Sequence, residues 1–402
     1  MTDVIIIGGG AAGLALSVML KTELPELSVK LLEKADRVGK KLATTGNGRC
    51  NITNSNLSPE RYHGDREFAA ETLQNFGFEA QKEFFNSIGL LFCEEDDGKV
   101  YPKSLQATSV VDALRFKTDE LGVETMLNIA VKEVKRDGDG FLTVCADKTL
   151  KAKIVVVAVG GQAGGNLGSV DGYSILKSIG HKIEKVFPSV VQLKTDTAFV
   201  RQLKGVKVDA LVTAKSDSGF RQEFGEVLFC DYGLSGPPIL QVSRLFDGGN
   251  MTVSLDIVPD MSENDIKTEL AKRANTFANR PLTELFTGFL HKRLGQVVLK
   301  YAGIDINLPC KTLNKKQIEK TAKTVKSFTF KVLGTTGIEN AQVTAGGAQC
   351  AQFFPSCMSK KAKGLFAIGE VLNVDGDCGG FNLAFAWASA FACRNGIKEI
   401  FK

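Results

Sequence analysis

The stretch Val4-Ile-Ile-Ile7 runs directly into Gly8-Gly-Gly10-Ala-Ala-Gly13, and an apolar run from Leu14 to Leu20 follows. Four β-branched residues in a row predict a buried strand, and the apolar run predicts a helix. The motif Gly-x-Gly-x-x-Gly therefore stands at a strand-to-helix junction. There its glycines allow a tight turn, close approach of a pyrophosphate, and close packing of the helix on the strand. Unpaired amides and the positive dipole end of the helix would then face the phosphates.

An acidic residue follows where a bound dinucleotide needs a hydrogen-bond acceptor. Ser28-Val-Lys-Leu-Leu-Glu33 has the pattern of a second strand, and Glu33 ends it twenty residues after Gly13. A carboxylate at this spacing accepts hydrogen bonds from the ribose in dinucleotide-binding folds. A glycine turn with a purely structural role is the alternative. The strand, the helix and the acid follow one another at the expected spacing, which favours dinucleotide binding over a structural turn.

Length and composition indicate an ordinary globular protein of more than one domain. The chain has 402 residues, of which 44% are hydrophobic and 24% charged, so we expect two or three domains. No apolar run approaches the roughly 20 residues that a membrane span needs. Because the N-terminus already carries the first strand, we expect no cleavable signal and a cytoplasmic protein. The net charge of +5 permits acidic partners without calling for nucleic acid.

The cysteines and histidines argue against a metal centre. Nine cysteines are scattered without a Cys-x-x-Cys pair, so they predict reduced, mostly buried thiols rather than disulfides or a zinc site. The three histidines, His63, His181 and His291, are too few for a histidine metal cluster. Their small number also argues against a hydrolase triad built on histidine.

A second glycine-rich loop follows the acid. From Thr45 to Asn54 the sequence is rich in glycine, asparagine and threonine, and the segment Lys34–Lys41 before it is basic. This composition suits contact with a polar, phosphorylated ligand, and an ordinary surface loop is the alternative. The candidate residues are Lys41, Gly46, Gly48, Arg49 and Asn51.

The pattern of the chain changes near Phe187-Pro188. Short strands separated by Gly, Asp and Ser turns then predict an inserted β-barrel. Helical patterning follows, with Ser262 as the expected N-cap. Strands resume at Ser327, and the chain then returns to the first domain. The predicted parts are 1–187 and 346–402 for the dinucleotide-binding domain, 188–257 and 327–345 for the barrel, and 258–326 for a small helical domain.

A lysine-rich stretch ends the predicted helical domain. Seven lysines and one acid, Glu319, lie between Lys311 and Lys331. Lys316, Lys320 and Lys323 would share one helical face. Most such runs are solvated faces. A role in binding nucleic acid or another acidic ligand is the alternative.

Several motifs in order along the chain resemble one family. The C-terminal strand Gly364–Glu370 ends at an acid, and a glycine pair follows it. Together with the opening fingerprint, these motifs are similar to the BaiN/RdsA-type flavoproteins, also called the aminoacetone oxidase family of FAD-binding enzymes. The resemblance spans most of the chain. The matching stretches are Thr45-Gly-Asn-Gly-Arg-Cys-Asn-Ile-Thr-Asn54, Leu228-Phe229 to Gly233-Leu-Ser-Gly-Pro237, Val343-Thr-Ala-Gly-Gly347, Ile368-Gly-Glu370 and Gly379-Gly-Phe-Asn-Leu-Ala384.

The resemblance implies an α/β fold: a glutathione-reductase-like, Rossmann-like FAD-binding domain split by an inserted β-barrel domain and a small helical domain. It implies that the first glycines hold the FAD pyrophosphate, Glu33 the AMP ribose, and Glu370 the ribityl or pyrophosphate. The helix after Gly380 would point at the pyrimidine edge of the flavin. The expected cofactor-binding residues are Gly8, Gly10, Ala11, Ala12, Gly13, Glu33, Lys34, Lys41, Thr45, Gly46, Asn47, Gly48, Arg49, Cys50, Asn51, Val131, Ala158, Gly160, Gly161, Gly369, Glu370, Gly380, Asn382 and Leu383.

The sequence departs from the family pattern in two places. Cys230-Asp231 stand where the family commonly has Thr-His, which leaves the substrate open because a potential histidine acid or base is absent. Thr45 and Asn47 replace a serine and a glycine of the loop. The residue that moves a proton is therefore unknown. The candidates are Arg49, Asp231, Tyr232 and Cys378.

The expected function is that of an FAD-dependent oxidoreductase. It would transfer a hydride between a small organic substrate (an amine, ketone or enone) and tightly bound FAD, in a cleft between the FAD domain and the barrel. No second Gly-x-Gly-x-x-Gly follows a strand, so a dedicated NAD(P)H domain is not expected. NADH or NADPH as a transient co-substrate and oxygen as acceptor both stay open.

Two alternatives stand beside this function. An RNA-binding flavoprotein would use the Lys311–Lys331 stretch to hold phosphates while a nucleobase is reduced or modified. A flavin-binding scaffold without turnover is the other. The sequence does not decide the oligomeric state.

Overall fold

The opening strand of the chain lies inside a seven-stranded sheet. In the computed structural model, which describes residues 1–402, β1 (Thr2–Ile7) pairs in parallel with β2 (Val29–Leu32) on one side and β10 (Thr149–Val157) on the other. β19 (Leu365–Ala367), from near the end of the chain, pairs in parallel with the last residues of β10. The sheet order is β7-β2-β1-β10-β9-β8, where β7 is Glu124–Met126, β9 is Gly140–Cys145 and β8 is Val131–Asp137.

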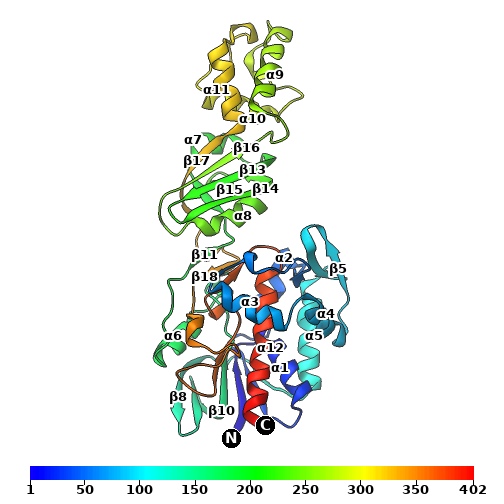
Figure 1. Cartoon of the computed structure of the whole chain (residues 1–402), viewed down its shortest axis with the longest axis vertical. Helices are drawn as coiled ribbons and strands as arrows, with labels where there is room; N and C mark the ends of the chain where they lie inside the picture. The colour runs from blue at the N-terminus through cyan, green and yellow to red at the C-terminus, as the bar shows by residue number, and fades with distance from the viewer. The chain divides into compact units, whose positions relative to one another are not determined.

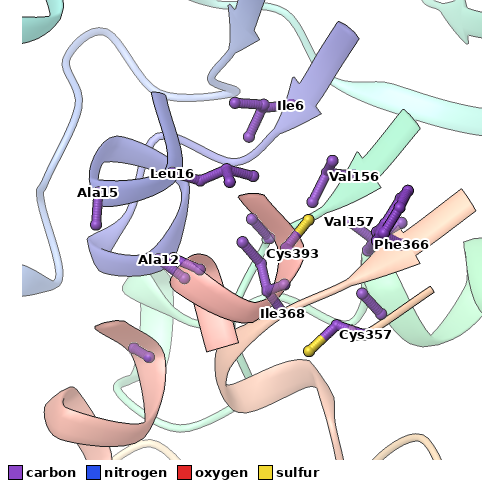
Figure 2. Packing of buried hydrophobic residues seen from close by; sticks show 14 of the residues in the cluster. Ile6, Ala12, Ala15, Leu16, Val156, Val157, Cys357, Phe366, Ile368 and Cys393 are labelled. Carbon is purple, nitrogen blue, oxygen red and sulfur yellow. The ribbon is translucent and has the colours of Figure 1, made fainter. Parts of the chain in front are cut away.

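Helices bury this sheet. The middle of β1 is fully buried, as expected of a strand in a parallel sheet with helices on its faces. Helix α1 (Ala11–Glu23) packs against α12 (Phe381–Phe401), the last helix of the chain (Figure 1). Figure 2 shows Leu16 of α1 beside Ile6 and Val156 of the strands, with Cys393 of α12 in the same cluster. The two ends of the chain therefore share one core.

The chain divides into two compact units. The first combines Met1–Ser189 with Ala341–Lys402, and the second is Val190–Asn340. The further elements of the first unit are α2 (Thr45–Gly48), β3 (Thr53–Asn54), β4 (Tyr62–Gly64), α3 (Arg66–Asn75), α4 (Phe78–Ser87), β5 (Phe92–Glu95), β6 (Lys99–Pro102), α5 (Ala107–Glu120), α6 (Asp171–Ser178), β11 (Phe187–Ser189), β18 (Val343–Ala345) and β20 (Val374–Gly376).

The second unit holds a closed barrel of six strands, all paired antiparallel. Alternate residues of its strands point inward, and Val212, Val253 and Phe328 are fully buried in its core. Closing the sheet leaves no open edge. The order around the barrel is β12 (Leu193–Thr195), β15 (Gly233–Ser235), β14 (Gly219–Phe229), β13 (Lys207–Ser216), β16 (Met251–Asp256) and β17 (Phe328–Thr335).

Three helices between β16 and β17 belong to the same unit as the barrel. They are α9 (Glu263–Thr276), α10 (Lys292–Tyr301) and α11 (Lys315–Lys326), and α11 contacts both of the others. Ser262 caps α9 in a capping box with Asp265, which confirms the expected N-cap. The other helices of this unit are α7 (Thr197–Val200) and α8 (Pro237–Val242).

The predicted fold class, an α/β Rossmann-like domain split by a β-barrel and a small helical domain, is confirmed. One detail differs. β18 was expected in the barrel, within 327–345, but it pairs with β11 in the first unit. Strand length and alternation do not specify a partner, so this error concerns pairing across distant parts of the chain.

None of the helices has both the length and the apolar character that crossing a bilayer requires. All nine cysteines are free thiols, and six of them are buried.

Candidate functional site: a dinucleotide cradle and two helix N-termini

The glycine turn after β1 is built to admit a ligand at one position and to exclude side chains at the others. A Cβ on Gly13 would lie 1.9 Å from the Gly8 carbonyl oxygen, and a Cβ on Gly8 would lie 2.5 Å from the Ala158 carbonyl oxygen. A Cβ on Gly10 would meet nothing within 4 Å. Gly8 and Gly13 are therefore fixed by packing, whereas Gly10 borders open space. This is the arrangement that a pyrophosphate close to the backbone requires.

The N-terminus of α1 offers free donors at this open position. Gly10 is its N-cap, no side chain caps the helix, and its first turn carries no acidic residue. The first amides of the helix therefore have no intrahelical partner, and the helix presents the positive end of its dipole there. Ala11 and Ala12, the first two residues of the helix, place no polar side chain at the turn. These features fit the diphosphate of a dinucleotide.

Glu33 is held against the glycine turn. Its Oε2 accepts from the Gly9 amide and its Oε1 from the Ala35 amide, both at 2.8 Å. A carboxylate has about four acceptor positions, so two remain for ribose hydroxyl groups. The Ile129 amide donates to the Glu33 carbonyl oxygen at 2.9 Å, which brings the loop before Val131 to the same place. The contact of Val131 with the adenine stays a prediction.

The Lys34 side chain contacts the segment around Gly168 and Asp171. Its Nζ lies 3.3 Å from Oδ2 of Asp171 and 3.5 Å from the Gly168 carbonyl oxygen. Lys34 is thus paired with the first turn of α6. Its role in cofactor binding stays a prediction.

Glu370 joins four separate segments of the first unit. Its Oε2 lies 2.7 Å from Nζ of Lys41 and 3.3 Å from the Gly161 amide. Its Oε1 accepts from the Thr344 amide at 2.8 Å. A Cβ on Gly161 would lie 2.4 Å from Oγ1 of Thr344, so that glycine is required by close packing. The sequence-predicted residues Lys41, Gly160, Gly161, Gly369 and Glu370 are thus brought together.

The Thr45–Asn51 loop has an unusual backbone. Gly46, Asn47, Gly48 and Cys50 all have positive φ angles, of 56°, 54°, 82° and 57°. The Cys50 amide donates to the Thr45 carbonyl oxygen at 3.0 Å and closes the loop. Burial raises the pKa of the Cys50 thiol to about 12, so this cysteine is not a reactive thiolate at neutral pH.

Two side chains at the end of the same loop are already engaged by the protein. Arg49 forms an ion pair with Glu95 and lies with Cζ 4.2 Å from the ring centroid of Tyr101. Asn51 accepts from the Val100 amide through Oδ1 at 3.2 Å. Both side chains therefore fix the loop to the β5–β6 hairpin. The contacts of this loop with a flavin stay predictions.

Helix α12 begins at a second glycine site. Gly379 and Gly380 have φ angles of 126° and 98°, and a Cβ on Gly380 would lie 2.4 Å from the Thr53 carbonyl oxygen. No side chain caps the helix, and no acidic residue stands in its first turn. Its first amides, those of Phe381, Asn382 and Leu383, therefore lack intrahelical acceptors. This second uncapped N-terminus fits the electron-rich edge of a flavin.

The side chain of Asn382 has a structural task. Its Nδ2 donates to the Gly376 carbonyl oxygen at 2.7 Å, and its Oδ1 accepts from the Gly376 amide at 2.8 Å. Asn382 thus clamps the turn that precedes the helix. Any contribution to a flavin would come from its backbone amide.

The four candidates for proton transfer divide between the two units. Arg49 and Cys378 belong to the first unit, and burial raises the pKa of the Cys378 thiol. Asp231 and Tyr232 belong to the second. The carboxylate of Asp231 is exposed and paired at 2.8 Å with Lys204, which lowers its pKa. Burial raises the pKa of Tyr232.

The sequence patterns did not point to a polar cluster that lies next to α12. Oδ1 of Asp377 lies 3.0 Å from Nε2 of His63, and its Oδ2 lies 3.4 Å from Nη1 of Arg61. The Asp377 side chain is only 3% exposed. Its place just before the glycine pair was a visible signal. Its partners could not be found from the sequence, because they come from β4 and its flank, more than three hundred residues away.

A hollow at the other end of the sheet has no part in this site. It is lined by Met1, Arg136, Lys153 and Phe401, among others, and so lies at the amino ends of the parallel strands. Ligands of open α/β sheets bind at the carboxyl ends of the strands. Gly8 and Glu33 follow the carboxyl ends of β1 and β2.

The chain matches a family model described as the HI0933-like protein Rossmann domain over residues 2–396. It is 34% identical over 408 residues to the 3-dehydro-bile acid delta(4,6)-reductase of Clostridium scindens, covering 99% of this chain and 100% of the relative. It is 30% identical over 402 residues to the ribosomal RNA dihydrouridine synthase of Escherichia coli, covering 98% of each.

Solved structures share the fold at low sequence identity. The 3-ketosteroid delta1-dehydrogenase of Sterolibacterium denitrificans aligns with a TM-score of 0.53 and 14% identity, covering 99% of each chain. An open conformation of a flavocytochrome c3 fumarate reductase aligns with a TM-score of 0.51 and 17% identity, covering 99% of this chain and 78% of that chain. At these identities the likeness concerns the fold alone.

Proposed function

The chain belongs to the HI0933-like family, whose BaiN/RdsA-type members are FAD-dependent oxidoreductases. From this premise we propose that it reduces a carbon–carbon double bond conjugated to a carbonyl group. The observation that carries the cofactor assignment is the pair of uncapped helix N-termini at Gly10 and Gly380 within one compact unit. One suits the diphosphate and the other the pyrimidine edge of the isoalloxazine. The open position at Gly10 supports the same assignment.

The substrate class comes from what the two relatives have in common. A 3-dehydro-bile acid with delta(4,6) unsaturation carries double bonds conjugated to its 3-oxo group. Dihydrouridine is uridine whose C5–C6 double bond, conjugated to the C4 carbonyl, has been reduced. Both names therefore describe addition of a hydride equivalent and a proton across an activated double bond. We assign this reaction class to the present chain.

The protein would contribute binding and electrostatics. FAD, when bound, supplies transfer of a hydride. The α1 N-terminus and Gly10 would hold its diphosphate, Glu33 its ribose, and the Lys41–Glu370 pair would line the region between. The N-terminus of α12 favours negative charge beside it, by about 0.3–1 kcal/mol and up to about 2 kcal/mol where the site is partly buried. None of these roles requires a titrating side chain.

A direct experiment tests the cofactor and the reaction together. Purified protein should be yellow, and acid should release FAD rather than FMN. The flavin should then be reduced anaerobically with NADH or NADPH and mixed with a steroidal 4-en-3-one, a 4,6-dien-3-one, a saturated ketone and an amine. We expect the two enones alone to reoxidise the flavin and to be recovered as saturated products. A colourless protein that cannot be reconstituted with FAD would refute the proposal, as would failure of every conjugated substrate.

A second candidate substrate is a uracil base within RNA, and the charge distribution favours it. Residues 258–326 contain thirteen Lys and Arg against seven Asp and Glu, an excess larger than the +5 of the whole chain. On α11, Lys316, Lys320 and Lys323 are exposed and form no ion pair. A surface of this kind suits phosphate groups. Because uracil carries the same conjugated double bond, this candidate changes the substrate and leaves the reaction class unchanged.

RNA binding can be measured by fluorescence polarisation with a structured, uridine-containing RNA. If RNA is the substrate, the triple variant K316E/K320E/K323E should bind much more weakly and show a smaller salt dependence. The matched control is K103E/K132E/K177E, which changes the same charge on exposed lysines of the first unit. Equal affinity of both variants, or no binding at low salt, would exclude this candidate.

A further inference from the structure

The first unit contains a histidine–carboxylate pair that the proposed reaction has not yet used. Arg61, His63 and Asp377 form what we call the Asp377 cluster. His63 lies in β4, and Asp377 directly follows β20. All three residues belong to the first compact unit.

Strand pairing builds the Asp377 cluster. β4 and β20 are antiparallel, with Tyr62 opposite Gly376 and His63 opposite Asp375. The Asp377 amide continues the ladder by donating to the Arg61 carbonyl oxygen at 2.9 Å. His63 and Arg61, the residue directly before β4, both reach the Asp377 carboxylate, whereas neighbouring side chains alternate along a strand. Tyr62 points the other way, into the core.

The carboxylate fixes the imidazole. A carboxylate accepts hydrogen bonds and donates none, so Nε2 of His63, at 3.0 Å from Oδ1 of Asp377, carries the proton. Nδ1 is then the nitrogen left for other chemistry. Asp377 is nearly completely buried, whereas the His63 side chain is 22% exposed. The imidazole therefore has one anchored nitrogen, and part of its side chain is open to solvent or a ligand.

The Asp377 cluster is attached to the start of α12. The Asp377 carbonyl oxygen accepts from Nδ2 of Asn382 at 3.3 Å, and the same amide group clamps Gly376. Arg61 lies with Cζ 5.7 Å from the ring centroid of Phe381, the first residue of the helix. His63 is thus held beside the helix N-terminus to which the proposed function assigns the flavin.

Neighbouring groups are poorer proton donors. Burial and the charge of Asp377 raise the pKa of Tyr62, whose hydroxyl already donates to the Phe381 carbonyl oxygen at 2.9 Å. Burial likewise raises the pKa of Cys378. A raised pKa makes each a weak acid at neutral pH.

We propose that His63 is the proton donor of the reaction and that Asp377 is the residue that positions it. This rests on the proposed function. Reduction of a conjugated double bond needs one hydride equivalent at the β-carbon, supplied by the FAD chemistry already assigned, and one proton at the α-carbon. The Nδ1–H bond of imidazolium breaks, a C–H bond forms at the α-carbon, and the nitrogen keeps the electron pair. The neutral imidazole then regains its proton from solvent.

The first test separates the two halves of the reaction. In His63→Gln the reduction of bound flavin by NADH or NADPH should stay within about threefold of wild type. Reoxidation by a conjugated enone should slow by about 10²- to 10⁴-fold, the usual contribution of a positioned acid. The control is His291→Gln, which changes an exposed histidine of the second unit and should leave both rates unchanged. Reoxidation by H63Q within threefold of wild type would overturn the proposal.

The second test needs neither substrate nor turnover. The chain has only three histidines, so nitrogen NMR of histidine-labelled protein can be assigned with H181F and H291Q. We expect the neutral form of His63 to carry its proton on Nε2 in wild type and to lose that preference in Asp377→Asn. Arg61→Gln, which leaves the His63–Asp377 bond in place, should keep it. An unchanged tautomer in D377N would show that Asp377 does not position His63.

These outcomes distinguish the proposal from its premise. If wild-type protein binds FAD but reduces no conjugated double bond, the proposed function fails. If wild type reduces an enone and H63Q does so equally well, only the assignment of the proton donor fails. Circular dichroism of H63Q and R61Q confirms that the variants compared are folded.

Discussion

Nζ of Lys41 and Oε2 of Glu370 lie 2.7 Å apart although 329 residues separate them in the chain. The two side chains are 28% and 19% exposed, so water screens the ion pair only in part. The same carboxylate accepts hydrogen bonds from the backbone amides of Gly161 and Thr344. These contacts join the two parts of the first unit, one before and one after the second unit in the chain.

Neutralising Glu370 should therefore weaken the first unit. We expect Glu370→Gln to lower the free energy of unfolding by about 1–3 kcal/mol, because one amide oxygen cannot replace both the charge and the two backbone contacts. Urea unfolding of the apoprotein measures this. Glu399→Gln, at an exposed ion pair in the last helix, should change it by less than about 0.5 kcal/mol. Equal effects of the two variants would mean that the junction carries no special stability.

Two glycines of the fingerprint should respond in opposite ways. Gly13→Val places a Cβ where the Gly8 carbonyl oxygen stands, so we expect the fold to lose about 3 kcal/mol or more. The Cβ of Gly10→Val meets no protein atom within 4 Å, so we expect this variant to cost the apoprotein about 1 kcal/mol or less and yet to abolish FAD binding. Unfolding curves and the flavin content of purified protein measure the two effects. Normal flavin content in G10V would refute the assignment of Gly10 to the pyrophosphate.

The start of α12 gives a further test. Gly380 has a φ of 98° and faces the Thr53 carbonyl oxygen, so Gly380→Ala should cost about 1–3 kcal/mol through strain alone. Gly380→Asp adds a negative charge at the helix N-terminus and should also yield apoprotein. The informative measurement is FAD affinity at a temperature where both variants are folded. If G380D binds FAD as tightly as G380A, the flavin edge does not lie at this helix end.

His181 should make the protein sensitive to acid. Burial and the nearby charge of Lys361 lower its pKa from 6.5 to about 4, and its ring stacks on Phe353 with centroids 4.6 Å apart. Because the folded-state pKa lies below the unfolded value, this contribution to stability is present above pH 6.5 and is lost as the pH falls towards 4.

At pH 5 the expected loss is about 2 kcal/mol relative to pH 7. The phenylalanine variant His181→Phe does not titrate, so its free energy of unfolding should fall by about that much less over the same interval. Denaturant unfolding at both pH values provides the comparison, with His291→Gln as the exposed control. A pH dependence unchanged in H181F would contradict the assignment.

By itself the sequence determined those features in which a few neighbouring residues decide the outcome. The β-branched run predicted β1, and the glycine spacing predicted the turn after it. Glu33 was predicted as the acid beside that turn. Each of these features depends on local backbone angles and on hydrogen bonds within one turn. Ser262 was predicted as a cap for the same reason. The alternation of short strands predicted the barrel, and the motifs predicted the family.

The tertiary structure decided which distant side chains meet. The antiparallel register of β4 and β20 brings His63 to Asp377, and the parallel pairing of β19 with β10 brings Glu370 towards Lys41. It also showed that the side chain of Asn382 clamps a turn. Sheet register is set by packing over the whole core rather than by the residues of either strand. A histidine alone in the sequence therefore gave no sign of its carboxylate.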